Sequence, residues 1–119
     1  MLVNENLNAA LEGMGNMYSE ITTAELESQL KEGKTLNLVD VRETEEWQEG
    51  HIKEARSIPL SVLQERIDEF QQGEEDIIII CRSGGRSGKA CDYLESQGYK
   101  VVNVAGGMLQ WQGEVATGE

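Results

Sequence analysis

Residues Asp76–Leu94, with the sequence DIIIICRSGGRSGKACDYL, form the pattern that decides the fold. Four consecutive isoleucines, Ile77–Ile80, lack the polar alternation of a half-exposed strand, so they predict a strand that is covered on both faces. A loop rich in glycine, serine and arginine begins at Cys81, where this strand ends. The stretch that follows predicts a helix over 85–98, closed by a glycine. Cys81 is therefore predicted to lie where a buried strand meets a polar loop and the start of a helix.

Strands and helices are predicted to alternate along the rest of the chain. Two helix starts carry the pattern of a capping box, Thr22 with Glu25 and Ser61 with Gln64. The predicted strands cover 35–41, 76–81 and 99–105, and a brief extended piece covers 55–60. The predicted helices cover 21–33, 43–50, 61–73 and 85–98. The last segment, 106–113, is predicted to begin with a glycine turn and to end as a short helix. This alternation predicts an α/β fold, a mostly parallel sheet with helices on both faces. In such sheets ligands bind at the carboxyl ends of the strands, where Cys81 is expected.

Length and composition predict one acidic domain. The chain has 119 residues and a net charge of −12, and we expect an N-terminal tail over 1–17 followed by a domain over 18–119. So acidic a chain is repelled by nucleic acid and by anionic membranes, so neither is expected as a partner. The N-terminus does not resemble a secretion signal, and no apolar run is long enough to span a membrane. We therefore expect a cytoplasmic protein with free thiols.

The loop after Cys81 has the composition of an anion-binding site. Backbone N–H groups in a glycine-rich loop before a helix point toward a common centre. Arg82 and Arg86 add positive charge to a chain that is otherwise negative. Positive charge and a helix N-terminus lower the pKa of a cysteine, so a reactive thiolate is expected at Cys81. The alternative is a core cysteine that ends a strand and precedes a turn without a ligand.

Three ordered motifs resemble those of the rhodanese-like sulfurtransferases. They are CRSGGRS at 81–87, DVRETEEWQEGHIKEARSIPL at 40–60 and GGMLQW at 106–111, and the likeness extends from about Tyr18 to Gln112. The resemblance implies a five-stranded parallel sheet flanked by helices. It also implies that Cys81 is the nucleophile and carries a sulfane sulfur as a persulfide. The substrate-binding residues that it implies are Arg82, Ser83, Gly84, Gly85, Arg86 and Ser87, through their backbone N–H groups.

The same resemblance implies a reaction and its rivals. We expect sulfur transfer from a small anionic donor such as thiosulfate to cyanide, a thiol or a protein thiol, by a monomer without a metal or organic cofactor. An alternative is a non-enzymatic sulfur-relay or protein-binding module. A cysteine phosphatase or arsenate reductase is a weaker alternative, because cysteine phosphatases place the loop arginine one position further along. Here Arg86 is five positions after Cys81.

Several other polar residues are interpreted as structural. His51 is far from Cys81 in sequence, so we expect its ring to bond to nearby backbone. We expect Asp40 and Arg42 to form an ion pair that braces the loop, although they could face the site.

The remaining candidates concern packing. Cys91 lies on the predicted inward face of the helix that follows Cys81, so we expect a packed thiol, not a disulfide. Trp47 and Trp111 are predicted to pack in or beside the core. Lys89 either widens the positive field at the loop or is simply exposed.

Overall fold

The computed structural model describes residues 18–70, 73 and 75–118, so the tail predicted over 1–17 lies outside the described residues. Its centre is a five-stranded sheet in the order β2-β6-β5-β3-β4, and every neighbouring pair is parallel. The strands are β2 (Ser19–Thr22), β3 (Asn37–Asp40), β4 (Arg56–Ser57), β5 (Ile77–Ile80) and β6 (Val101–Ala105). The five-stranded parallel sheet that the resemblance implied is therefore confirmed.

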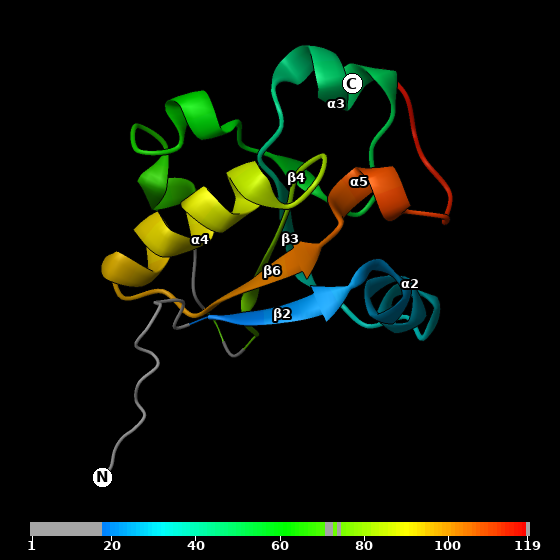
Figure 1. Ribbon diagram of the computed structural model, residues 1–119, viewed down its shortest axis with the longest axis horizontal. Coiled ribbons are helices and arrows are strands. Elements are labelled where there is room, and N and C mark those ends of the chain that lie inside the picture. Colours follow the sequence, from blue (N-terminus) through cyan, green and yellow to red (C-terminus); the bar gives the residue numbers. More distant parts are fainter. Residues whose placement is uncertain (1–17, 71–72, 74, 119) are drawn as a thin grey trace, which may run out of the picture.

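Helices cover both faces of this sheet (Figure 1). They are the α-helices α2 (Thr23–Lys31), α3 (Thr44–Glu49), α4 (Gly85–Ser96) and α5 (Gly107–Gln110), and the 3-10 helices η1 (Leu60–Val62) and η2 (Ile67–Glu69). One core cluster joins the sheet to α4 and to the segment of η1 and η2. A second cluster joins the other face to α2, to Trp47 of α3 and to residues around α5. The two-sided α/β arrangement is as predicted.

The central strand β5 is buried along its whole length. Ile77 and Ile79 belong to the core cluster under α4, whereas Ile78 and Ile80 belong to the cluster under α2. Each isoleucine contributes about 1.5–3 kcal/mol when it is fully buried, so both faces hold this strand in place. Cys81 follows directly and belongs to the cluster under α4.

The first helix begins as predicted, but a strand precedes it. Thr22 Oγ1 accepts from the Glu25 backbone N–H at 3.0 Å, and Glu25 Oε1 accepts from the Thr22 N–H at 2.8 Å, so the capping box is confirmed. Strand β2, just before it, was not predicted. It is an edge strand that pairs only with β6, and its sequence SEIT contains a single apolar residue.

The helix predicted over 61–73 is wrong. The chain forms two separate 3-10 turns there, η1 and η2, and the capping box of Ser61 with Gln64 is replaced by a hydrogen bond from the Ser61 hydroxyl to the Glu43 carboxylate at 2.9 Å. The Arg66 guanidinium binds Glu69 at 2.7 Å and the Ser57 carbonyl at 3.3 Å. The tertiary contacts to Glu43 and to Ser57, together with the burial of Leu63 and Phe70, outweigh local helix propensity.

A glycine pair docks α5 onto the loop that follows β5. The Met108 N–H donates to the Cys81 carbonyl at 2.8 Å, and the Leu109 N–H donates to the Arg82 carbonyl at 2.9 Å. Gly107 has a φ of 56°, and a Cβ at this position would lie 2.6 Å from the Arg82 carbonyl oxygen. Only glycine permits both the backbone conformation and this close approach.

Gly107→Ala should therefore lower the free energy of unfolding by more than Gly33→Ala. Gly33 has a φ of 81°, but a Cβ at this position would meet nothing within 4 Å, so this variant reports the conformational cost alone. We expect about 1–2 kcal/mol for Gly33→Ala and roughly 1–3 kcal/mol more for Gly107→Ala. Urea denaturation measures both values, and equal losses would show that the approach to the loop is not tight.

Candidate active site

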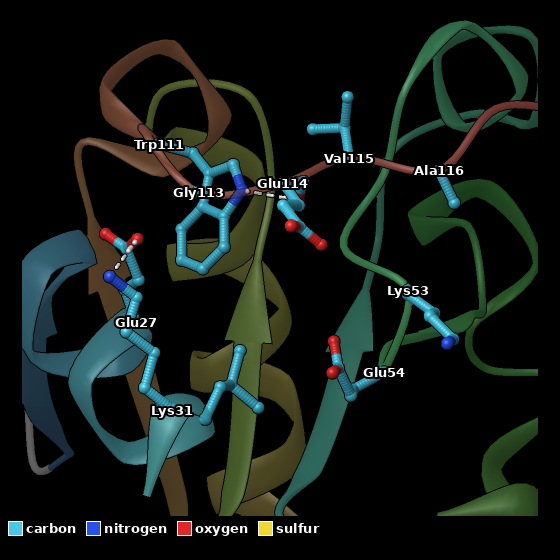
Figure 2. A pocket seen from close by; sticks show the side chains of 10 residues that line it. Glu27, Lys31, Lys53, Glu54, Trp111, Gly113, Glu114, Val115 and Ala116 are labelled. Carbon is cyan, nitrogen blue, oxygen red and sulfur yellow. Dashed lines mark hydrogen bonds and ion pairs between the residues drawn. The ribbon is translucent and has the colours of Figure 1, made fainter.

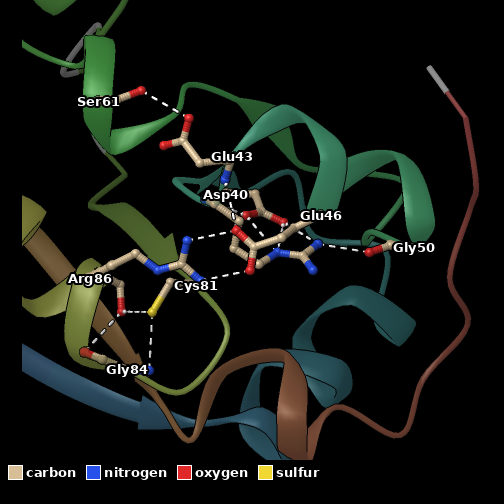
Figure 3. A network of polar contacts seen from close by, with 10 residues as sticks. Asp40, Glu43, Glu46, Gly50, Ser61, Cys81, Gly84 and Arg86 are labelled. Carbon is tan, nitrogen blue, oxygen red and sulfur yellow. Dashed lines mark hydrogen bonds and ion pairs between the residues drawn. The ribbon is translucent and has the colours of Figure 1, made fainter.

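The sulfur of Cys81 lies at the carboxyl end of the central strand, beside the N-terminus of α4 (Figure 3). The Gly84 backbone N–H donates to Sγ at 3.1 Å, and the Ser87 Oγ lies 3.2 Å from Sγ. Gly84 has a φ of 111° and caps the helix, a conformation that residues with a Cβ rarely adopt. The turn thus aims a backbone donor and a hydroxyl at one sulfur atom.

A chain of polar side chains continues from Ser87 along the face of the sheet that α4 covers. The buried Ser87 hydroxyl donates to Asn103 Oδ1 at 2.5 Å, and Asn103 Nδ2 donates to Glu20 Oε2 at 3.2 Å. Because an ionised carboxylate only accepts, Glu20 orients the amide so that its oxygen faces Ser87. The thiol form of Cys81 donates to Ser87, and in the thiolate form the Ser87 hydroxyl can turn its proton toward the sulfur.

Asn103 and Glu20 were missed by the sequence analysis. Asn103 lies on β6 on the same face as Val101, which packs under α4. Its one visible sign was a polar residue inside the apolar run VVNVA. A buried polar side chain in a strand needs a partner, and that partner could have been sought in the neighbouring loop.

The surroundings of Cys81 favour its charged form. Burial acts to raise the pKa of this thiol, but hydrogen bonds from the Ser87 hydroxyl and from the backbone of Ser87, Gly84 and Ser83 outweigh it. The pKa of Cys81 is therefore lowered from the ordinary value of 9.0. Because a thiolate is the nucleophilic form, the site needs no separate base to activate this cysteine.

The two loop arginines have different surroundings. The Arg86 guanidinium makes two hydrogen bonds to the Glu46 carboxylate, at 2.6 and 2.8 Å, and Figure 3 shows this pair beside Cys81. The hydrogen bond from Arg86 lowers the pKa of Glu46 to about 2. Arg82 is exposed and makes no ion pair with any residue that the structure describes. The positive charge expected from Arg86 is thus matched by a carboxylate that the sequence analysis did not identify.

A hollow of about 310 Å³ opens beside the loop. Leu109, which projects from α5 at its rim, is 64% exposed. The hollow is lined by Arg42, Glu46, Glu49, Arg82, Met108 and Leu109. It provides space for a small molecule or a partner's side chain next to the residues that hold Cys81.

The family model described as the rhodanese-like domain matches residues 22–114. This chain belongs to the rhodanese-like domain family. It is 44% identical to the putative sulfurtransferase YtwF of Bacillus subtilis over 95 residues, which cover 80% of this chain and 91% of that protein. It is 38% identical to a protein named sulfurtransferase from Allochromatium vinosum over 96 residues, which cover 80% of this chain and 89% of the relative.

Solved structures agree with this assignment. A rhodanese-like domain protein from Staphylococcus aureus superposes with a TM-score of 0.78 and 38% identity, covering 85% of this chain and 99% of the other. A rhodanese-related protein from Thermoplasma volcanium gives a TM-score of 0.74 and 31% identity, covering 83% and 98%. The rhodanese-like fold predicted from the three motifs is confirmed.

In this rhodanese-like chain Asp40 and Arg42 form a buried ion pair. Arg42 Nη2 lies 2.8 Å from Asp40 Oδ2, and the same nitrogen donates to the Gly50 carbonyl at 2.7 Å. The predicted ion pair is confirmed, but it joins the end of β3 to the end of α3 through Gly50, so its predicted role as a brace of the loop after Cys81 stays a prediction. Arg42 also lines the hollow beside the loop, with its charge already matched by Asp40.

His51 is structural, as predicted. Its ring stacks on Trp47 with centroids 3.6 Å apart, and its Nδ1 lies 2.7 Å from the Trp47 carbonyl oxygen. Its backbone also pairs with Ala116, which holds the C-terminal segment beside α3. Trp47 is buried and Trp111 is partly buried against the same core cluster, so the packing predicted for both tryptophans is confirmed.

Cys91 is a packed thiol, as predicted. Both cysteines are free, and Cys91 is fully buried on the core face of α4 with Ala90 and Leu94. Burial, followed by the charge of Asp92, raises the pKa of Cys91 to about 12. Lys89, on the first turns of α4, is exposed.

A second hollow, of about 350 Å³, lies between α2 and the C-terminal segment (Figure 2). Its lining residues are Glu27, Leu30, Lys31, Lys53, Glu54, Trp111, Gly113, Glu114, Val115 and Ala116, and none belongs to the loop after Cys81. Within the described residues there is no group of three or more side chains that could hold a metal ion. None of the described helices has the length and hydropathy needed to cross a membrane.

The two cysteines should ionise in different pH ranges. The ultraviolet absorbance of thiolate, taken as the difference between the protein and its Cys81→Ser variant, should show Cys81 ionising below pH 9.0, the ordinary value. Ser87→Ala removes the hydroxyl that stabilises the thiolate, so the midpoint of Cys81 should move upward. Cys91 should stay protonated until about pH 12. An unchanged midpoint in Ser87→Ala would contradict the role of this hydroxyl.

Proposed function

We propose that this chain is a rhodanese-type sulfurtransferase in which Cys81 carries a sulfane sulfur as a persulfide. The observation that carries the proposal is the contact of the Cys81 sulfur with the Gly84 N–H and the Ser87 hydroxyl. The Gly84 N–H stabilises negative charge on the cysteine, and the Ser87 hydroxyl does so when its proton turns toward the thiolate. The loop around them follows a buried strand that holds it in place. The names of the sulfurtransferase relatives support the same reaction class.

In the first half-reaction the Cys81 thiolate attacks the outer sulfur of a donor such as thiosulfate. A bond forms between Sγ and that sulfur, and the bond to the sulfonate sulfur breaks with its electron pair, so that sulfite leaves. The product is a Cys81 persulfide anion, and total charge is conserved. The loop from Arg82 to Ser87 would then hold the terminal sulfur through backbone N–H groups.

In the second half-reaction a thiophile attacks the terminal sulfur of the persulfide. Cyanide would leave as thiocyanate, whereas a thiolate or protein thiolate would leave as a new persulfide. The bond to Sγ breaks with its electron pair and restores the Cys81 thiolate. No general base among the described residues is required, because the nucleophile of each half-reaction, first the Cys81 thiolate and then cyanide or a thiolate, attacks as an anion. We propose that this chemistry takes place in the cytoplasm, a reducing compartment in which free cysteines such as these two persist. We also propose that the chain acts as a monomer.

A sulfur relay without rapid turnover is the second candidate. It is favoured by the burial of Cys81, whose exposed fraction is only 1%. A chain in this role would form the same persulfide but pass it on only to a docked partner. Turnover with cyanide therefore distinguishes the two candidates, since a relay would be loaded with sulfur yet release it slowly to a small acceptor.

Intact-mass spectrometry after incubation with thiosulfate tests the proposal. The protein should gain one sulfur atom, and cyanide should remove it. Cys81→Ser should not be loaded, whereas the matched control Cys91→Ser should be loaded like the unmodified protein, because Cys91 is a fully buried, protonated core thiol. Circular dichroism should show that both variants remain folded.

Two outcomes would overturn the assignment. A protein that gains no sulfur from thiosulfate or from an organic persulfide is not a sulfur carrier. Loading that persists in Cys81→Ser and disappears in Cys91→Ser would show that Cys91, and not Cys81, carries the sulfur.

A further inference from the structure

The Arg86–Glu46 ion pair joins the loop that holds the nucleophile to a separate helix. Arg86 lies in the first turn of α4, and Glu46 lies on α3, forty residues earlier in the chain. The Arg86 guanidinium donates one hydrogen bond to each oxygen of the Glu46 carboxylate. Both side chains remain about one-third exposed, so the pair lies at the mouth of the site and not in the core.

This pair changes the charge that a substrate meets. Of the three arginines around the mouth, Arg42 is matched by Asp40 and Arg86 by Glu46, which leaves Arg82 without an ion-pair partner among the described residues. Another carboxylate, Glu49, lines the hollow of about 310 Å³ beside the loop. The whole chain carries a charge of −12. A dianion that approaches the Cys81 thiolate therefore meets little net positive charge.

We infer that Glu46 is a specificity-determining residue, because its carboxylate offsets the positive charge of Arg86. The site then favours singly charged donors of sulfane sulfur, such as organic persulfides and thiosulfonates, over the dianion thiosulfate. This inference rests on the proposed function and names the substrate class of the same site. Glu46 itself need not touch the substrate, because it acts through the charge of Arg86 and through its own charge at the mouth.

The effect follows from the charge gathered in the transition state. Attack of a thiolate on thiosulfate brings three negative charges together, whereas attack on a thiosulfonate brings two. Each unit of negative charge on the donor is repelled by Glu46 and attracted by Arg86, so loss of the carboxylate charge should help the dianion more than the monoanion. The pKa of Glu46 is about 2, so this carboxylate is charged throughout the pH range of an ordinary assay.

The alternative is that the ion pair only fastens α3 to the loop. Glu46→Gln separates the two roles, because Gln keeps an amide oxygen that can accept from Arg86. That oxygen can also replace Glu46 Oε1, which accepts from the Glu43 N–H at 3.1 Å in the capping box of α3. If the ion pair only holds α3 against the loop, its loss should change kcat/KM for all donors by the same factor.

The experiment measures kcat/KM with cyanide as acceptor for two donors, thiosulfate and methanethiosulfonate. Both present a terminal sulfane sulfur bonded to an oxidised sulfur, and they differ by one unit of charge. The selectivity is kcat/KM for thiosulfate divided by kcat/KM for methanethiosulfonate. The matched control is Glu45→Gln, which removes the same charge from an exposed neighbour on α3 that makes no ion pair with the described residues.

Glu46→Gln should raise the selectivity for thiosulfate by roughly 3- to 30-fold, as expected for the loss of one partly exposed unit charge at the mouth of the site. Glu45→Gln should change it by less than about 2-fold, because an exposed charge is well screened. Arg86→Gln leaves Glu46 without its partner and should lower the selectivity. These opposite shifts are expected at every pH at which Glu46 is ionised.

Equal selectivity in Glu46→Gln and the unmodified protein, or shifts of the same sign in Glu46→Gln and Arg86→Gln, would overturn the inference. Should Glu46→Gln fail to fold, Arg86→Gln decides alone, since unchanged or raised selectivity contradicts the inference. Failure of the proposed function is distinct, because the unmodified protein would then transfer sulfur from neither donor and would gain no sulfur in the mass spectrum.

Discussion

The placement of one sulfur atom at the end of a buried strand is the constraint on which the rest of the structure depends. Cys81 itself is 1% exposed, and a thiolate in such surroundings loses most of its hydration. The Gly84 N–H and the Ser87 hydroxyl compensate for that loss, and both positions are set by the turn into α4. This turn is itself held by α5, where the N–H groups of Met108 and Leu109 bind the carbonyls of Cys81 and Arg82.

The two ends of the site perform different tasks. At its base, Ser87, Asn103 and Glu20 form a polar chain that keeps a hydroxyl beside the sulfur. At its mouth, the Arg86–Glu46 pair sets the charge that an incoming donor meets. In the proposed reaction the base governs how readily the thiolate forms and the mouth governs which donors are favoured, so separate substitutions should alter the two properties.

Much of this arrangement could be predicted from the sequence, because its signals are local. Four isoleucines predict a buried strand, a Thr–Glu spacing predicts the start of α2, and the glycine-rich loop predicts a turn that leads into α4. Edge strand β2 and the two 3-10 turns over 60–69 were not predicted, since pairing with β6 and the contacts of Arg66 decide them. Glu46 and Asn103 were missed for the same reason: each meets the loop only in the folded chain.

Backbone amide chemical shifts, recorded before and after the protein is loaded with one sulfur atom, test the central claim most directly. A persulfide anion held by the turn should shift the amide resonances of Ser83, Gly84 and Ser87 most strongly, because these groups already surround the sulfur. Amides around Cys91 and along the second hollow should change little. Changes that are centred on Cys91, or that are absent from the turn after Cys81, would contradict the claim that this turn holds the transferred sulfur.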